Sequence, residues 1–510
     1  MSKLTFILFC FVFWVGFTKA QTYNNGYLLD KPAAVFRGLH LVDDTLIAHG
    51  YLAEWFPPFP VKYIIAKIDL DGTPLIGYSA MLDSFTDYFT ASRFLITKDG
   101  GFAFVGTKGL SGVGGLFFKL KRNGSIEFAK QYIDSTAWGY GFIGVIELPD
   151  SCFIILGRHT TANDIISSIL IKTDPSGNTI WRKKFSYLNE IPTDITLLQS
   201  GHILLSSSCS GNNFNGPTSN INTLFRTIDT AGNLLSTWID TTKKTFGANA
   251  YLQLNDSGGI YVSEWINAIY NSGGNPPTYL SMRTGYIVRE DSLHNKLWEL
   301  KLGQASAIPN LFQLKKLSDG NYLAVGGTYD STYTDGQPYK NTGWLIKLNE
   351  DGKVIWQRKY FNTEDYPGQT NYLYDFVELP DGGIVAAGER IDWFNDYPQR
   401  GWLLRLDSYG CLVPGCESVG IEGSENEVSY LSVYPNPISD RLHIYFNAPN
   451  EQNHYSLKIY SVEGRELYNI PNLVNHTTYI LNTESFPKGV LIAQFFNESR
   501  IISSRKIIKP

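Results

Sequence analysis

The sequence predicts an all-β protein: a seven-bladed β-propeller followed by a small C-terminal β-sandwich. Three observations support this prediction. Tyr, Phe and Gly are abundant, with 31, 30 and 47 copies in 510 residues, a composition that favours strands over helices. A weak motif recurs seven times between residues 21 and 416, and the last eighty or so residues show strand-like alternation without that motif. With 43% hydrophobic and 18% charged residues, the chain is expected to be globular and to form more than one domain.

The N-terminus has the layout of a secretory signal peptide. Lys3 precedes an apolar run over residues 4–17, and Thr18-Lys19-Ala20 follows. We predict a signal peptide over residues 1–20, with cleavage between Ala20 and Gln21. The apolar run is short for a membrane span, and no later segment is long enough, so we expect no transmembrane segment in the mature chain. An uncleaved anchor is the alternative.

The charge balance argues against nucleic acid as a partner. Removal of residues 1–20 takes away Lys3 and Lys19, which leaves 41 basic and 48 acidic side chains and a net charge of −7. Nucleic acids and anionic membrane surfaces select positively charged proteins.

Each repeat begins with a turn and an apolar strand, and continues with a strand, a second turn and another strand. The starting positions lie 50 to 62 residues apart, at Asp43, Asp99, Asp150, Ser200, Ser257, Asp319 and Asp381. A period of this length with three or four short strands is typical of a propeller blade. An aromatic residue follows the second turn in several repeats, at Phe128, Trp181, Trp298 and Trp356. We interpret these rings as packing between blades; a binding role is the alternative.

The two ends of the repeat region suggest how the ring closes. The last repeat has no outer strand after Asp407-Ser-Tyr-Gly410, whereas the extended segment 23–29 precedes the first repeat without a partner. Pairing of this segment with the last blade would remove an exposed sheet edge. We therefore predict that the N-terminal segment completes the seventh blade.

In most repeats a long connection joins the apolar strand to the strand that follows it. This connection is rich in aromatic and amide side chains. In a four-stranded meander these connections lie with the blade-to-blade connections on one face, here called the long-loop face, opposite the short turns. Flat rings beside polar groups can stack on sugars or anchor a protein partner. They can equally pack the loops down. The candidate ligand-binding residues are Trp55, Tyr270, Tyr333, Tyr339, Trp393 and Tyr397.

Motifs for catalysis or cofactor binding are missing from the sequence. It has no HExxH or CxxC pair, no Gly-x-Ser-x-Gly elbow, and no nucleotide-binding glycine pattern that follows a strand and opens a helix. We therefore expect no metal and no cofactor, and name no catalytic acid or base. Asp69 with Asp71, and Asp330 with Asp335, could bind calcium, but turn formation is the preferred interpretation.

Four cysteines remain after the signal peptide. Cys411 and Cys416 flank a tight Leu-Val-Pro-Gly turn, and export permits a disulfide between them; two free thiols are the alternative. Cys152 and Cys209 lie in apolar strand patterns and are expected to be buried.

The tail carries its own set of motifs. Residues 417–431 form a Glu-, Gly- and Ser-rich linker, and residues 432–510 alternate as strands around 441–446, 455–460, 478–481, 490–496 and 504–508. Tyr434-Pro435-Asn436-Pro437 opens this segment, Ile459-Tyr-Ser-Val-Glu-Gly464 follows, and Gly489 precedes a basic last strand with Lys506 and Lys509.

These motifs resemble the type IX secretion C-terminal sorting domain of Bacteroidota. The resemblance covers residues 432–510, under a sixth of the chain, with Gly489-Val-Leu where the family usually has Gly-x-Tyr. It implies export through the periplasm and across the outer membrane by the type IX machinery. Removal of the tail and release or surface attachment would follow.

The sequence thus favours a secreted or surface-displayed propeller that binds a glycan or a surface protein without catalysis. A polysaccharide hydrolase or lyase and a structural surface component are the alternatives. Clustered carboxylates, His or Tyr in a central pocket would favour the enzyme.

Overall fold

The computed structural model describes most of the chain, and the statements below refer to this part. The predicted cleavage site at Ala20 and Gln21 lies outside it. The described ranges are 22–27, 33–53, 61–75, 92–108, 114–163, 165–186, 189–210, 221–240, 247–254, 258–271, 279–302, 310–329, 341–362, 369–392, 399–412, 431–434, 437–438, 440–446, 455–461, 464–474, 477–497 and 500–509.

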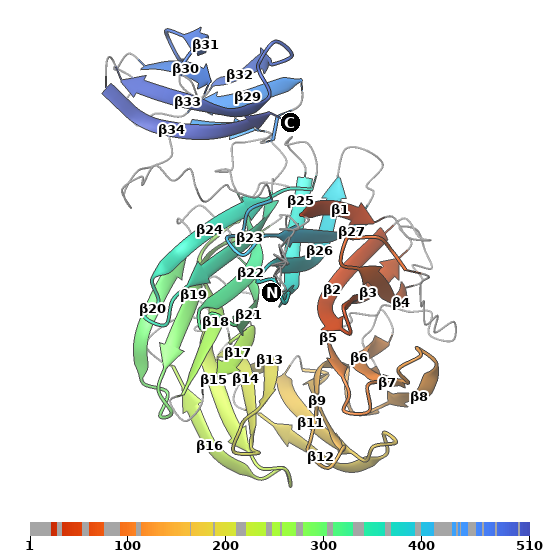
Figure 1. Cartoon of the computed structure of the whole chain (residues 1–510). Helices are drawn as coiled ribbons and strands as arrows, with labels where there is room; N and C mark the ends of the chain where they lie inside the picture. Colours follow the sequence, from red (N-terminus) through yellow and green to blue (C-terminus); the bar gives the residue numbers. More distant parts are fainter. Residues whose placement is uncertain are drawn as a thin grey trace, which may run out of the picture.

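Regular structure in these ranges consists of strands alone, and seven antiparallel blades follow one another around the ring in Figure 1. Blades 1 to 3 are β2 (Ala33–Val42), β3 (Thr45–Ala53), β4 (Val61–Asp69); β5 (Ser92–Ile96), β6 (Phe102–Lys108), β7 (Gly114–Leu120), β8 (Ile126–Tyr132); and β9 (Gly139–Glu147), β10 (Phe153–Thr160), β11 (Ile166–Thr173), β12 (Thr179–Phe185). Blades 4 and 5 are β13 (Asn189–Leu197), β14 (Ile203–Ser210), β15 (Ile221–Ile228), β16 (Leu234–Ile239); and β17 (Ala250–Gln253), β18 (Gly259–Asn271), β19 (Tyr279–Glu290), β20 (Lys296–Leu302). Blades 6 and 7 are β21 (Asn310–Lys316), β22 (Tyr322–Tyr329), β23 (Asn341–Leu348), β24 (Val354–Tyr360); and β25 (Gln369–Glu378), β26 (Ile384–Asp392), β27 (Gln399–Leu406), β1 (Tyr23–Tyr27).

The first strand of every blade lies on the inside of the ring. Each of these strands contacts the first strand of the next blade, in the order β2, β5, β9, β13, β17, β21 and β25, and β25 contacts β2 again. The ring is therefore closed, and the predicted seven-bladed propeller is confirmed.

Closure uses the N-terminal strand, as predicted. β1 pairs antiparallel with β27 over its whole length, from Tyr23 opposite Arg405 to Tyr27 opposite Gly401. Trp402 donates its indole N–H to Asn24 Oδ1 at 2.7 Å, and the Tyr27 hydroxyl donates to the Gly72 carbonyl of blade 1 at 2.7 Å. The first strand of the chain thus supplies the outer strand of the last blade and also contacts the first blade.

The recurrent aromatic residues of the outer strands pack against the following blade, which confirms that interpretation. Each ring covers a turn glycine with positive φ in the next blade, where an added Cβ would lie 2.7 to 3.2 Å from a ring atom. Only a residue without a side chain fits under the ring in that conformation. The pairs are Phe128 with Gly177, Trp181 with Gly232, Trp298 with Gly352, and Trp356 with Gly410.

Replacement of one of these rings should destabilise the propeller. Trp298 also donates its indole N–H to the Glu350 carbonyl of the next blade at 3.0 Å. We expect Trp298→Ala to lower the free energy of unfolding by about 3 kcal/mol, because it removes a packed ring and leaves a cavity between blades. Urea denaturation measures this change. Leu293→Ala, at a side chain 74% exposed in the same blade, is the control, and an equal effect of both substitutions would contradict the packing role.

The C-terminal segment forms a two-sheet β-sandwich with its own core. One sheet has the order β28 (Leu431–Tyr434), β29 (Arg441–Phe446), β32 (Thr477–Asn482), and the other β31 (Glu466–Ile470), β30 (Tyr455–Ser461), β33 (Gly489–Asn497), β34 (Arg500–Lys509). All thirteen buried residues of this core lie between Ile438 and Ile507. The five predicted strands are confirmed. β28 and β31 were not predicted; β31 is an edge strand without a fully buried side chain, so it shows no clear apolar alternation.

Among the predicted sorting-motif residues, Gly464 lies in a turn, Gly489 begins β33, and the two lysines lie in the last strand. Gly464 and Gly489 have φ values of +82° and +114°, which favour glycine. Pro437 is partly buried, and Pro435 and Asn436 lie outside the described residues. Lys506 and Lys509 belong to β34, where the Lys509 ammonium donates to the Thr483 carbonyl.

The cysteines follow the predictions in part. Cys411 is buried and disulfide-bonded, whereas Cys416, its predicted partner, lies outside the described residues. Cys209 is buried and free, as expected. The expected burial of Cys152 is wrong: it is only partly buried, because it lies in the turn before β10, where its N–H donates to Asp150 Oδ1.

Candidate ligand-binding site

The predicted ligand-binding residues fall almost entirely in long connections that the described ranges leave out. Tyr270 belongs to β18, but its side chain is not among those described. Trp55, Tyr333, Tyr339, Trp393 and Tyr397 lie outside the described residues. Their role therefore stays a prediction.

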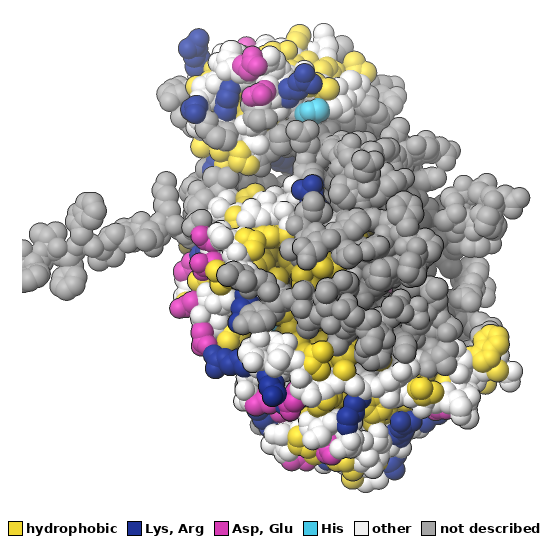
Figure 2. Space-filling model, turned by 90° about the vertical axis from the view of Figure 1, so that its right-hand side faces the viewer, with side chains coloured by type: hydrophobic (Ala, Val, Ile, Leu, Met, Phe, Trp, Pro, Cys, Tyr) yellow, Lys and Arg dark blue, Asp and Glu magenta, His cyan; other side chains and the backbone are white. Residues whose placement is uncertain are grey.

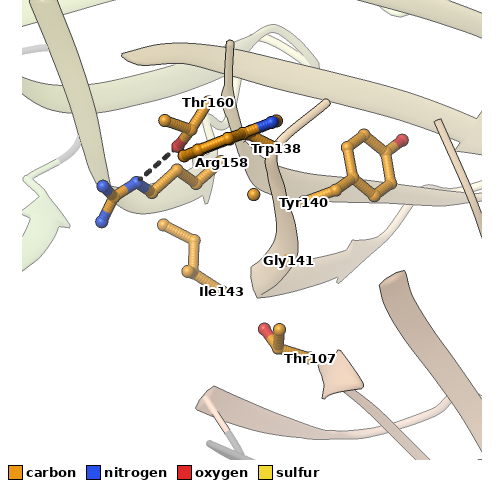
Figure 3. A pocket seen from close by; sticks show the side chains of 8 residues that line it. Thr107, Trp138, Tyr140, Gly141, Ile143, Arg158 and Thr160 are labelled. Atoms are coloured by element: carbon orange, nitrogen blue, oxygen red, sulfur yellow. Dashed lines mark hydrogen bonds between the residues drawn. The ribbon is translucent and has the colours of Figure 1, made fainter. Parts of the chain in front are cut away.

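A hollow of about 410 Å³ opens on the long-loop face between blades 2 and 3 (Figure 3). Its walls come from the end of β6, the start of β9 with the connection before it, and the end of β10, which are the strand ends that define this face. We call it the Trp138 pocket. Its lining residues are Thr107, Trp138, Gly139, Tyr140, Gly141, Ile143, Arg158 and Thr160.

Trp138 is the most exposed aromatic side chain among the described residues, at 70%. The connection that carries it is nevertheless well ordered by hydrogen bonds. Asp134 Oδ1 accepts bonds from the N–H and hydroxyl of Thr136, and the Trp138 N–H donates to the Thr160 carbonyl at 2.7 Å. The backbone thus fixes the position from which the indole projects. Tryptophan is enriched among the residues that anchor binding partners.

Two glycines leave the floor of the pocket open. At Gly141, a Cβ would lie 2.1 Å from Thr107 Oγ1, so any side chain would push blades 2 and 3 apart. At Gly139, a Cβ would lie 3.3 Å from Thr160, within the hollow itself. The pocket therefore exists because Gly139 and Gly141, at the start of β9, place no side chain in it.

Arg158 supplies the positive charge of the pocket. Its side chain is exposed, and its Nε donates to Thr160 Oγ1 at 3.3 Å, while the two terminal nitrogens point away from Thr160 (Figure 3). Partial burial lowers the pKa of this guanidinium. Among the described residues, no carboxylate forms an ion pair with Arg158.

The inner wall of the pocket is rigid and uncharged near neutral pH. Tyr140 is buried between Phe142 and His159, with ring centroids 5.7 and 6.1 Å away, and burial raises the pKa of Tyr140 to about 12. Burial also lowers the pKa of His159, whose Nε2 lies 3.5 Å from Asp134 Oδ2. Both rings therefore act as neutral packing behind the pocket.

Buried carboxylates of inner strands have structural partners. Asp194 Oδ2 accepts the N–H of Tyr251 in the next blade at 2.9 Å, and Asp375 Oδ2 accepts the N–H of Leu39 in blade 1 at 3.0 Å. Asp375 Oδ1 also lies 2.6 Å from Lys315 Nζ. These two side chains join neighbouring inner strands.

Two further buried carboxylates lie in hydrogen-bonded networks. Glu190 accepts the Ser168 and Ser207 hydroxyls at 2.6 and 3.0 Å and pairs with Arg226. Glu389 accepts hydrogen bonds from the Tyr374 hydroxyl and the Gln399 amide. The sequence did not point to these networks, because their members come from separate strands.

A second hollow, of about 550 Å³, flanks the closing strand β1. It is lined by amide and guanidinium groups of Asn24, Asn25, Asn362, Arg390 and Arg400, together with Gly26, Tyr27, Gly72 and Pro74. Asn24 and Tyr27 already bond to Trp402 and Gly72, so much of this lining belongs to ring closure.

The proposed calcium ligands of blade 1 act within their own turn. Asp69 Oδ1 accepts the Leu70 N–H at 2.7 Å, and Asp71 Oδ1 accepts the Thr73 N–H at 2.8 Å. Asp330 and Asp335 lie outside the described residues. In the part of the chain that is described, no three His, Cys, Asp or Glu side chains gather as they would around a metal ion.

The described surface carries both signs of charge, and Figure 2 shows Lys and Arg interspersed with Asp and Glu along the margin of one face. Within the described ranges, no helix is long and apolar enough to cross a membrane.

Comparison with solved structures finds several at low identity. An ulvan lyase of polysaccharide lyase family PL25, bound to a sulfated glucuronic acid–rhamnose unit, is 11% identical, with 78% of this chain and 98% of that chain covered and a TM-score of 0.44. A Dyadobacter fermentans protein of unknown function is 10% identical, with coverages of 62% and 95% and a TM-score of 0.38. The α-L-arabinanase of Penicillium chrysogenum, complexed with arabinobiose, is 10% identical, with coverages of 62% and 93% and a TM-score of 0.36.

Among curated proteins, none matches the sequence. The C-terminal sandwich, in contrast, matches a family model over residues 432–509, described as the secretion system C-terminal sorting domain. This match confirms the resemblance drawn from the Pro-Asn-Pro, Gly464 and Gly489 motifs. Residues 432–509 belong to the secretion system C-terminal sorting domain family, and the chain is a β-propeller protein exported by type IX secretion to the cell surface or beyond.

Proposed function

We propose that the exported propeller is a non-catalytic binding module that takes a sugar ring of a glycan in the Trp138 pocket. The observation that carries this proposal is the Trp138 indole, 70% exposed yet held by an ordered backbone at the edge of a 410 Å³ hollow. The apolar face of a sugar ring stacks on such an indole, and its hydroxyls then need polar partners at the rim. The hydroxyls of Thr107 and Thr160 and the guanidinium of Arg158 provide them.

The carboxylates favour binding over hydrolysis or elimination. A glycosidase needs two carboxyl groups free to face the same glycosidic bond. Here the lining residues of the pocket include no carboxylate, and the Asp194, Asp375, Glu190 and Glu389 side chains already bond to neighbouring strands. A pocket lined without a carboxylate supports a module that holds its ligand unchanged.

Substitution of Trp138 tests the proposal. We expect Trp138→Ala to weaken binding to glycans on a panel of plant, algal and bacterial oligosaccharides by roughly 30-fold, because the loss of a central aromatic anchor costs about 2 kcal/mol. The mature protein and the variant would be compared by titration calorimetry on each glycan that binds.

Tyr409→Ala is the matched control, because Tyr409 is also an exposed aromatic, at 54%, and lies in a short turn on the opposite face. It should bind as the unaltered protein does. Equal affinity of the Trp138→Ala variant, or shortened glycans in the recovered samples, would contradict the proposal.

A further inference from the structure

Arg158 differs from Arg226 and Arg405 because, among the described residues, no carboxylate forms an ion pair with it. Arg226 pairs with Glu190, and Arg405 lies 3.1 Å from Asp381 Oδ2. Arg158 is exposed and has the Thr160 hydroxyl as its hydrogen-bond partner, and partial desolvation lowers its pKa. A guanidinium in this state gains more from an added anion than a fully hydrated one does.

Other basic side chains near the pocket add to the positive charge of Arg158. Lys184 lies close enough to lower the pKa of His159 by charge repulsion, and Arg182 Nη1 donates to the Ile133 carbonyl in the connection that carries Trp138. Asp134 is the nearby carboxylate among the described residues, and its oxygens are engaged by Thr136 and lie beside His159. Among the described residues, the side chains around the pocket are thus mainly basic, on a chain whose net charge is −5.

Trp138 and Arg158 both line the hollow, so one ligand can meet both side chains. A ring stacked on Trp138 would present an equatorial substituent toward Arg158, whose two terminal nitrogens can form a bidentate pair with a planar or tetrahedral oxyanion.

We infer that the Trp138 pocket selects sugar rings that carry an acidic group, a carboxylate or a sulfate, and that Arg158 binds this group. The inference rests on the proposed function, since it names the class of sugar that the pocket would take. It assigns Trp138 to affinity for the ring and Arg158 to discrimination between acidic and neutral rings.

Two matched pairs of ligands test this assignment. The first pair is a short oligogalacturonate and its carboxyl-reduced, neutral counterpart; the second is a sulfated galactan oligosaccharide and its desulfated form. We expect the mature protein to bind the acidic member of at least one pair at least tenfold more tightly than the neutral member. The pair that shows the preference identifies carboxylate or sulfate as the group recognised, and the preference should shrink as salt is raised.

The variants separate the two roles. Arg158→Gln should bring the affinities for the acidic and neutral members of a pair to the same value. Arg158→Lys should keep part of the preference, because a point charge then replaces a bidentate pair. Arg122→Gln, which alters an arginine exposed on the short-turn face and paired with Asp43, is the control and should change neither affinity.

Equal affinity for the acidic and neutral forms, or a preference that survives Arg158→Gln, would overturn the inference. The proposed function would still stand if Trp138→Ala weakened binding as expected. Failure of all four sugars to bind would overturn the inference for these acid classes, and binding of neutral glycans elsewhere on the panel would then keep the proposed function. Affinities that Trp138→Ala leaves unchanged would overturn both the inference and the proposed function.

Discussion

Removal of residues 22–27 is expected to destabilise the propeller by more than about 5 kcal/mol. The deletion takes away a complete outer strand paired with β27 and the buried rings of Tyr23 and Tyr27, each of which contributes about 2 kcal/mol through burial alone. It also exposes the edge of β27 and leaves the Trp402 indole without Asn24. Thermal and urea denaturation of the mature and shortened proteins measure the loss, and the open edge should promote aggregation.

The substitution Asn24→Ala is the graded control for this deletion. It removes the hydrogen bonds to Trp402 and the Phe361 carbonyl but keeps the strand, so we expect a loss of about 1–3 kcal/mol. A melting temperature that stays the same when residues 22–27 are absent would show that β1 does not close the ring.

Removal of residues 432–510 is expected to abolish delivery to the outside of the cell. The matched sorting domain occupies this segment, and its core is built from its own residues, from Ile438 to Ile507. The shortened protein should accumulate in the periplasm, as measured by fractionation and by protection from protease added to whole cells. Surface exposure equal to that of the full chain would contradict the assignment.

The purified truncated protein provides the control for folding. Because the buried core of the sandwich contains no propeller residue, the propeller without the tail should unfold at the same temperature as the propeller within the full chain. A large drop in that temperature would mean that the export defect reflects misfolding rather than loss of the sorting domain.

The sequence predicted the features of the fold that depend on local chemistry. Turn glycines such as Gly177 and Gly352 adopt positive φ, and in several blades an aromatic residue follows four positions later because it covers the next blade. Closure was predictable because the unpaired N-terminal segment and the incomplete last repeat complement each other. The sorting domain was predictable because its motifs are specific.

The Trp138 pocket was not predictable in the same way. The long connections carry most of the aromatic residues that predict a binding surface, whereas Trp138 lies in a short connection between blades. The hollow depends on contact between Gly141 and Thr107, which belong to different blades, and on the placement of Arg158 across the sheet from Gly141. The one local signal was Trp138-Gly-Tyr-Gly141, a ring followed by two glycines at the start of an inner strand. The partners of Glu190 and Glu389 likewise come from strands that only the tertiary structure brings together.

The most direct test of glycan binding without turnover at the Trp138 pocket is oxidative labelling of the mature protein with and without a saturating oligosaccharide. Trp138, 70% exposed, should label readily in the free protein and be protected in the complex, while Tyr409 labels equally in both and the oligosaccharide is recovered intact. Unchanged labelling of Trp138 in the presence of bound ligand, or recovery of a shortened oligosaccharide, would contradict the account.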